Sequence, residues 1–154
     1  MTTFLLIIHG LLAVALLGAV THQLIALWRT APVVGAGFMA RLKAVRAASY
    51  ANAIVVLYAL DFFIGSIIYA TYRVEVRPYL EDIGAFIAAG SFETKEHLAA
   101  LGLGLLPAYW LVWKAPNFVA AVTARRTVTV LLGFFVWWNF LVGHILNNLR
   151  GLPE

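Results

Sequence analysis

The chain of 154 residues is too apolar and too sparsely charged for a water-soluble domain. Its side chains are 63% hydrophobic and 12% charged, and its mean hydropathy is +0.90, whereas soluble domains average about 45–50% apolar and about 25% charged residues. A soluble chain of this length has too much surface to hide so many large apolar groups. The lack of cysteine excludes disulfides, thiolate metal sites and covalently attached haem c. The net charge of +4 comes with no nucleic-acid motif, so nucleic-acid binding is not expected.

Four segments are long and apolar enough to cross a bilayer, whose core of ~30 Å needs about 20 helical residues. They run from about 4 to 28, 52 to 72, 94 to 113 and 127 to 149. The first is interpreted as a retained helix, because it lacks a basic N-terminal region and its apolar run is longer than that of a signal peptide. The sequence therefore predicts an all-α, integral membrane four-helix bundle, with residues 1–154 forming a single transmembrane domain.

The short loops predict the orientation of the bundle. Two of them carry basic residues and no acid, whereas the central loop is mixed in charge and rich in acids. The basic residues are Arg29, Arg41, Lys43 and Arg46 in the first loop, and Lys114, Arg125 and Arg126 in the last. Basic loops stay in the cytoplasm, so both termini and the acidic loop are expected outside, in the periplasm if the membrane is a bacterial inner membrane.

Three local signals accompany the spans. Residues 38–49 are expected to form a short basic amphipathic helix at the lipid headgroups. The stretch 78–87 is expected to form a helical turn or two on the outer surface. Ser91 is the predicted N-cap of the third span, with Glu93 in its first turn.

Small and polar residues predict which helix faces meet, because lipid surrounds the bundle. At 100° per residue, one such face can be drawn on each of three spans. The faces are Tyr58, Asp61, Gly65, Tyr69 and Tyr72 on the second span, Glu93, His97, Gly104 and Ala108 on the third, and Gly133, Trp137, Phe140, His144 and Asn148 on the fourth. These faces are expected to line the interior.

Two histidines suggest a haem site. His9 and His144 lie at matched depth below the outer ends of the first and last spans, and two imidazoles on facing helices can ligate a b-type haem. Gly133 and Trp137 would line its pocket. His22, near the cytoplasmic end, has no histidine at its level, so a second haem is not expected.

The overall plan resembles small four-helix cytochrome b-type membrane subunits, with four apolar helices, histidines near the membrane faces and almost no extramembrane mass. The resemblance covers the whole chain and rests on this architecture and on His9 and His144. It implies electron transfer through haem b.

Two other chemical functions and one purely structural role remain open for these polar residues. His9, His144, His97 and Glu93 offer nitrogen and oxygen ligands for a metal ion. Asp61, with Tyr58 beside it, could handle protons or contact quinone, because an acid within a membrane span is usually functional. Alternatively, these polar groups simply hold helices together.

The chain carries no nucleotide-binding loop, dinucleotide fingerprint or nucleophile–base set, so it is not expected to be an enzyme on its own. We expect an integral membrane subunit of an electron-transfer or respiratory-type complex that binds haem b or contacts quinone. The alternatives are a structural or assembly subunit and a metal-binding membrane protein. The expected partners are membrane lipid and other membrane or periplasmic subunits.

Overall fold

The computed structural model describes residues 2–28, 37, 46–115 and 119–151, and their regular secondary structure is helical throughout. Four long helices dominate: α1 (Thr2–Leu27), α3 (Tyr50–Thr71), α5 (Phe86–Lys114) and α6 (Val119–Gly151). Three short elements connect them: the 3-10 turn η1 (Ala47–Ser49), the π-helical turn η2 (Tyr72–Val76) and the helix α4 (Arg77–Asp82).

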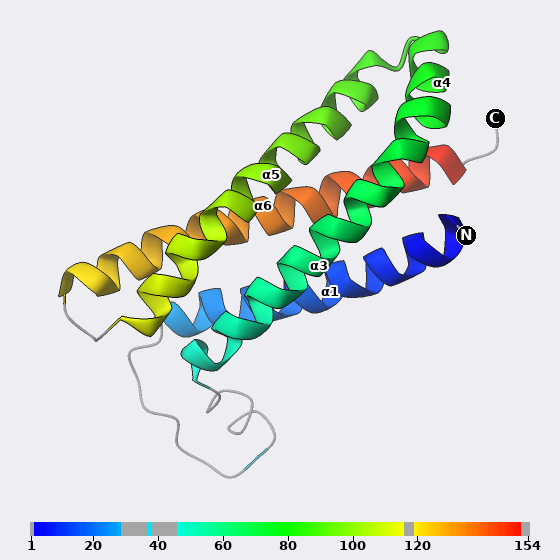
Figure 1. Ribbon diagram of the computed structural model, residues 1–154. Helices are drawn as coiled ribbons and strands as arrows, with labels where there is room; N and C mark the ends of the chain where they lie inside the picture. Colours follow the sequence, from blue (N-terminus) through cyan, green and yellow to red (C-terminus); the bar gives the residue numbers. More distant parts are fainter. Residues whose placement is uncertain (1, 29–36, 38–45, 116–118, 152–154) are drawn as a thin grey trace.

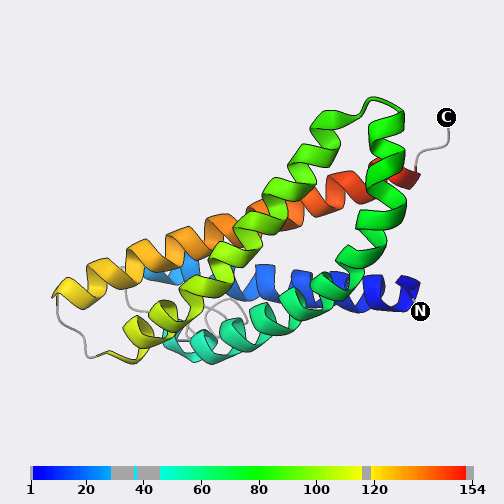
Figure 2. The same cartoon turned by 45° about the horizontal axis from the view of Figure 1, so that its top comes forward.

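The four long helices form a closed bundle in which neighbours in the chain are neighbours in space. α1 packs on α3, α3 on α5, α5 on α6, and α6 closes the ring on α1 (Figure 1). The beginning of α1 and the end of α6 lie at the end of the bundle that carries α4, and the turned view agrees (Figure 2). The two ends of the described chain thus lie at the same end of the bundle, as the sequence predicted. The side of a membrane that this end faces stays a prediction.

The hairpin between α3 and α5 forms where the chain leaves its apolar run. η2 continues α3 into α4, and Pro78 stands in the first turn of α4, where its missing N–H is not needed. Gly84 ends the turn with a φ of +72°, a left-handed conformation that favours glycine. The short surface helix predicted within residues 78–87 is therefore confirmed.

The bundle has an apolar core and apolar outer faces. Buried side chains from all four long helices meet inside, including Val20, Ile54, Tyr109 and Leu132. Many large apolar side chains also lie exposed on the outer faces: Phe4, Leu11, Val14, Phe63, Leu101 and Phe134 are examples. An outside this apolar suits lipid rather than water.

Three segments of the described chain are long and apolar enough to cross a membrane: Thr3–Leu27, Ala47–Asp82 and Ala121–Asn148. α5 has the length but is less apolar, because Glu93, Lys95 and Glu96 lie near its start and Lys114 at its end. The described residues thus support a membrane bundle with three such helices. The fourth span, at residues 94–113, stays a prediction.

Of two local predictions, one is wrong and the other falls mostly outside the described residues. The predicted N-cap at Ser91 is wrong: α5 already begins at Phe86, so Ser91 lies inside the helix. This extra turn packs against the end of α3, because the rings of Tyr72 and Phe92 stack 3.6 Å apart and the Tyr72 hydroxyl donates to the carbonyl of Ala89 at 3.4 Å. Most of the predicted amphipathic helix at 38–49 falls outside the described residues, and its last three residues form η1.

The predicted inward face is confirmed on α3 but wrong on α5. Tyr58 of α3 and Tyr72, the first residue of η2, are buried, and Asp61, Gly65 and Tyr69 are half-buried. On α5, however, His97, Gly104 and Ala108 are exposed, and the buried residues are Ala89, Gly102, Leu106, Tyr109 and Trp113. Large aromatic residues can line this interior because their polar atoms find partners there: the Trp113 indole N–H donates to Thr129 Oγ1 at 3.1 Å.

The predicted face of α6 is correct at one end and wrong at the other. Gly133 is buried, but Trp137, His144 and Asn148 are exposed. The buried residues are Thr129, Leu132 and Val136 instead. Histidine and asparagine near a helix end lie close to the headgroups, where polarity is tolerated on any face, so they gave a poor signal for the helix rotation.

Candidate functional site

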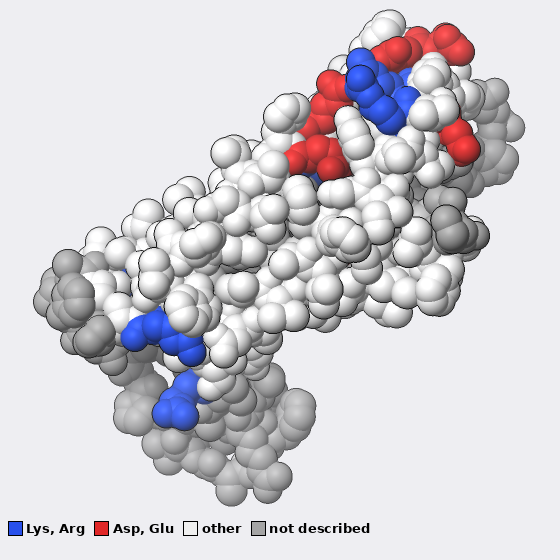
Figure 3. Space-filling view, viewed as in Figure 1, with Lys and Arg blue, Asp and Glu red and all other residues white. Residues whose placement is uncertain are grey.

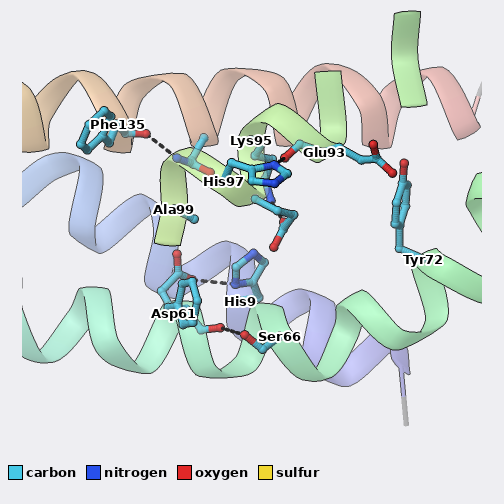
Figure 4. Close-up of polar contacts among 12 residues, drawn as sticks. His9, Asp61, Ser66, Tyr72, Glu93, Lys95, His97, Ala99 and Phe135 are labelled. Carbon is cyan, nitrogen blue, oxygen red and sulfur yellow. Dashed lines mark hydrogen bonds and ion pairs between the residues drawn. The ribbon is translucent and has the colours of Figure 1, made fainter. Parts of the chain in front are cut away.

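A histidine and a carboxylate face each other across the contact between α1 and α3. Nδ1 of His9 lies 2.7 Å from Oδ1 of Asp61 (Figure 4). Gly65 makes this approach possible, since a Cβ at that position would lie 3.2 Å from Cε1 of the His9 ring. The two side chains are 26% and 17% exposed, so most of the pair is enclosed by the bundle.

A small cavity adjoins this pair. Its volume is about 70 Å³, and all four long helices line it. The polar residues around it are His9, Tyr58, Asp61, Lys95, Glu96 and Asn139. Such a volume holds about two water molecules and is far below the ~300 Å³ of a small-molecule pocket. The chamber therefore suits water rather than an organic ring.

Three buried polar atoms around the cavity lack a hydrogen bond: His9 Nδ1, Asp61 Oδ1 and Asn139 Oδ1. The first two lie at ion-pair distance but not in line for a hydrogen bond. The amide nitrogen of Asn139 donates to the carbonyl of Phe135 at 2.7 Å, which leaves its oxygen unpaired. Since buried polar groups normally find partners, the Asn139 oxygen marks a place for water in the cavity.

A second ion pair borders the cavity from α5. Nζ of Lys95 lies 2.7 Å from Oε1 of Glu96, with side chains only 12% and 25% exposed. The ammonium group also lies 4.8 Å from the ring centroid of Phe92. Gly143 of α6 leaves room for the lysine stem, because a Cβ there would lie 3.3 Å from Cε of Lys95. A carboxylate and an aromatic face together stabilise this largely buried cation.

Tyr58 closes another side of the cavity. Its hydroxyl donates to the carbonyl of Ala99 at 2.9 Å, and it is only 5% exposed. This bond ties α3 to α5 one turn of helix away from Asp61. Tyr58 is therefore held in place by a backbone carbonyl and borders the cavity together with Asp61.

The acidic residue proposed as a metal ligand at the helix mouth is bound to arginines instead. Oε1 of Glu93 pairs with both Arg73 and Arg77, and Arg77 also pairs with Glu81. This cluster fastens α4 and η2 to α5 on the mixed-charge end of the bundle (Figure 3).

The four predicted metal ligands are not brought together. Nδ1 of His97 lies 2.7 Å from the backbone carbonyl of Glu93, and the His97 side chain is exposed. Within the described residues, no group of three or more histidine, aspartate or glutamate side chains could hold a metal ion. The arrangement thus offers no preformed metal centre among these residues.

His144 also lies apart from the cavity. It is exposed on α6, stacks on Phe140 with ring centroids 6.1 Å apart, and has Nε2 3.2 Å from Nδ2 of Asn148. On the other side, the ring of His9 itself fills the space beside Gly65. Within this chain the residues do not fit a haem held between His9 and His144. Haem binding as such stays a prediction.

The other predicted haem-pocket residues make contacts of their own. Gly133 leaves space for the side chain of Leu24, so it serves the packing of α6 on α1. The indole N–H of Trp137 donates to Thr21 Oγ1 at 3.1 Å across the same contact. Both residues therefore tie α1 to α6.

Sequence reasoning missed three residues of the site, Lys95, Glu96 and Asn139. The two charges stand at the mouth of the third span, where a solvated position is the ordinary expectation. Asn139 was the clearer signal, because it is an amide in the middle of the apolar run of α6.

Comparison of the chain with known protein families, with curated proteins and with solved structures finds no match. Any functional conclusion therefore depends on the chemistry of this site.

Proposed function

We propose that this chain is a membrane subunit of a quinone-linked electron-transfer complex, in which His9 and Asp61 exchange protons with a quinone headgroup. The observation that carries the proposal is the 2.7 Å approach of imidazole and carboxylate inside an apolar bundle. Ionisable groups at such depth are costly and mostly mark ion, proton or substrate sites. The adjoining cavity, with the unpaired amide oxygen of Asn139, adds a place for the water that proton exchange needs.

The pair has the chemistry for this task. Reduction of a quinone consumes protons as well as electrons, and imidazole gains and loses a proton near neutral pH. A carboxylate beside the ring orients it and stabilises its charged form. The cavity is too small for a quinone ring, so the headgroup contacts the exposed edge of the pair from the lipid.

Two charged residues that line the cavity lie nearer the end of the bundle that carries α4. Lys95 and Glu96 stand in the first half of α5, which packs against α4. Toward the other end, the buried side chains of Leu16, Ile54 and Leu106 fill the interior. Protons therefore exchange with the α4 end, which is the outer side under the predicted orientation.

Photolabelling tests the proposal directly. The full chain in liposomes is illuminated with an azido-quinone, and the labelled peptides are identified by mass spectrometry. We expect label on α1 and α3 near His9 and Asp61, displaced by excess unmodified quinone. Asp61→Asn should reduce the label several-fold. The matched control is Asp82→Asn, which removes one acid from the end of α4.

Equal labelling of wild type and Asp61→Asn, or label spread evenly over the chain, would overturn the quinone proposal. The structural or assembly role then becomes the better account. Helix content measured by circular dichroism distinguishes a lost site from a misfolded variant. Should Asp61→Asn misfold, the paired variant His9→Gln with Asp61→Asn replaces both partners by neutral groups and answers the same question.

A further inference from the structure

The end of the bundle opposite α4 carries described basic residues and no described acid. These residues are Arg46, Lys114, Arg125 and Arg126, and the visible face of this end shows blue but no red (Figure 3). Each of the last three lies over a tryptophan ring. Tryptophan favours the headgroup level of a membrane. Trp28 and Trp110 are exposed, whereas Trp113 is buried, so we expect the cations over the two exposed rings to lie near lipid phosphates.

The three cations are not equivalent. Arg125 lies 5.0 Å from the Trp113 ring and also donates to the carbonyls of Val112 and Ala115 at 3.1 Å, so it caps the end of α5. Arg126 is exposed and lies 5.2 Å from the ring of Trp28, which is 61% exposed. The ring fixes one face of this guanidinium, and its N–H groups stay directed along the guanidinium plane, as recognition of a phosphate requires.

The surroundings of Arg126 select an amphiphile rather than a free anion. Ile25 lies one turn before Trp28 on α1, and Val130 lies one turn after Arg126 on α6. Both are exposed, at 62% and 43%. Along the bundle axis, both lie about one helical turn farther from this end of the bundle than Trp28 and Arg126. α1 and α6 pack on one another, so a phosphate at Arg126 would have apolar surface for acyl chains directly below it.

We propose that Arg126 and Trp28 bind the phosphate of an anionic phospholipid in the contact between α1 and α6. The headgroup lies on the guanidinium, and the acyl chains lie along Ile25 and Val130. This binding is independent of the quinone site, which lies toward the other end of the bundle.

Native mass spectrometry of the purified full chain in detergent tests the proposal. Phosphatidylglycerol, phosphatidylcholine and inorganic phosphate are each titrated in turn. We expect tighter binding of phosphatidylglycerol than of phosphatidylcholine, and no competition from inorganic phosphate. Arg126→Gln should weaken phosphatidylglycerol binding about fivefold, the effect expected for one basic residue at an anionic surface. Trp28→Leu should weaken it as well.

The matched control is Arg73→Gln, which removes the same charge at the α4 end, where Arg77 still holds Glu93. This variant should bind phosphatidylglycerol like the wild type. Equal weakening by both arginine variants would show an effect of net charge and overturn the site. Displacement of the lipid by inorganic phosphate would reassign it as a free-anion site. If Arg126→Gln misfolds, Trp28→Leu and the lipid comparison on the wild type decide the matter.

Discussion

The hydroxyl of Tyr58 occupies the space that any side chain at Gly102 would need. A Cβ built on Gly102 would overlap the phenol oxygen, with the ring carbon that bears it 2.7 Å away. The same hydroxyl donates to the carbonyl of Ala99, less than one turn earlier on α5. One glycine therefore sets the distance between α3 and α5 beside the cavity. Small residues permit such close approach in membrane bundles.

Gly102→Ala is expected to destabilise the protein by about 1–3 kcal/mol, because the phenol ring must move and its hydrogen bond to Ala99 is strained. Gly104→Ala is the matched control two residues away, since nothing lies within 4 Å of its Cβ position. It should be neutral or stabilise by up to about 1 kcal/mol through helix propensity. Denaturant unfolding in detergent measures both, and equal effects would contradict the packing described.

A buried chain of hydrogen bonds joins α1, α5 and η1. The Tyr109 hydroxyl donates to Gln23 Oε1 at 2.6 Å, and Gln23 Nε2 donates to the carbonyl of Ala47 at 3.1 Å; both side chains are fully buried. Tyr109→Phe leaves the glutamine oxygen unpaired and should lower the free energy of unfolding by about 1–3 kcal/mol. Tyr79→Phe, at a residue 50% exposed on α4, should have little effect. An unchanged free energy of unfolding in Tyr109→Phe would show that this network does not contribute to stability.

Hydropathy predicted the long helices, and the alternation of basic and acidic loops between them predicted that both chain ends lie together. Neither pattern could predict the rotation of each helix about its axis. A helix surrounded by lipid is apolar on every side, so its inward face differs from its outward face only in packing. For this reason the pattern predicts Gly104 as an interior glycine, although it lies on the exposed side of α5, and does not distinguish Gly102, which is buried.

The site was predictable to the extent that one residue broke the apolar pattern. Asp61 stood out as an acid within a span, and its partner His9 was singled out for a different reason, its depth. Their pairing depends on the register between α1 and α3, which the linker sequence does not determine. The place of Lys95 and Glu96 in the site could not be predicted, because it depends on how far α5 extends before its apolar part begins.

The predicted orientation can be tested with single cysteines, since the chain has none of its own. Gly90 is exposed near the start of α5, and Ser49 is exposed just before α3, at the opposite end of the bundle. Each is replaced by cysteine in turn. In intact cells, an impermeant thiol reagent should label Gly90→Cys from outside and leave Ser49→Cys unlabelled until the membrane is opened. The reverse pattern would place both chain ends in the cytoplasm. Labelling of both from outside would contradict a bundle that spans the membrane.

The histidines allow a spectroscopic test of the haem prediction. His9 is held between Gly65 and Asp61, and His144 is exposed on α6 beside Asn148. Because the two side chains have these different contacts, we expect the purified chain to show no α-band of a haem ligated by both histidines in a reduced-minus-oxidised spectrum. Such a band, lost in His9→Ala and equally in His144→Ala but kept in His22→Ala, would contradict the arrangement of α1 and α6 described above. A band lost only in His144→Ala would show that the exposed histidine binds haem with a ligand from a partner chain, and would leave the His9–Asp61 pair free for proton exchange.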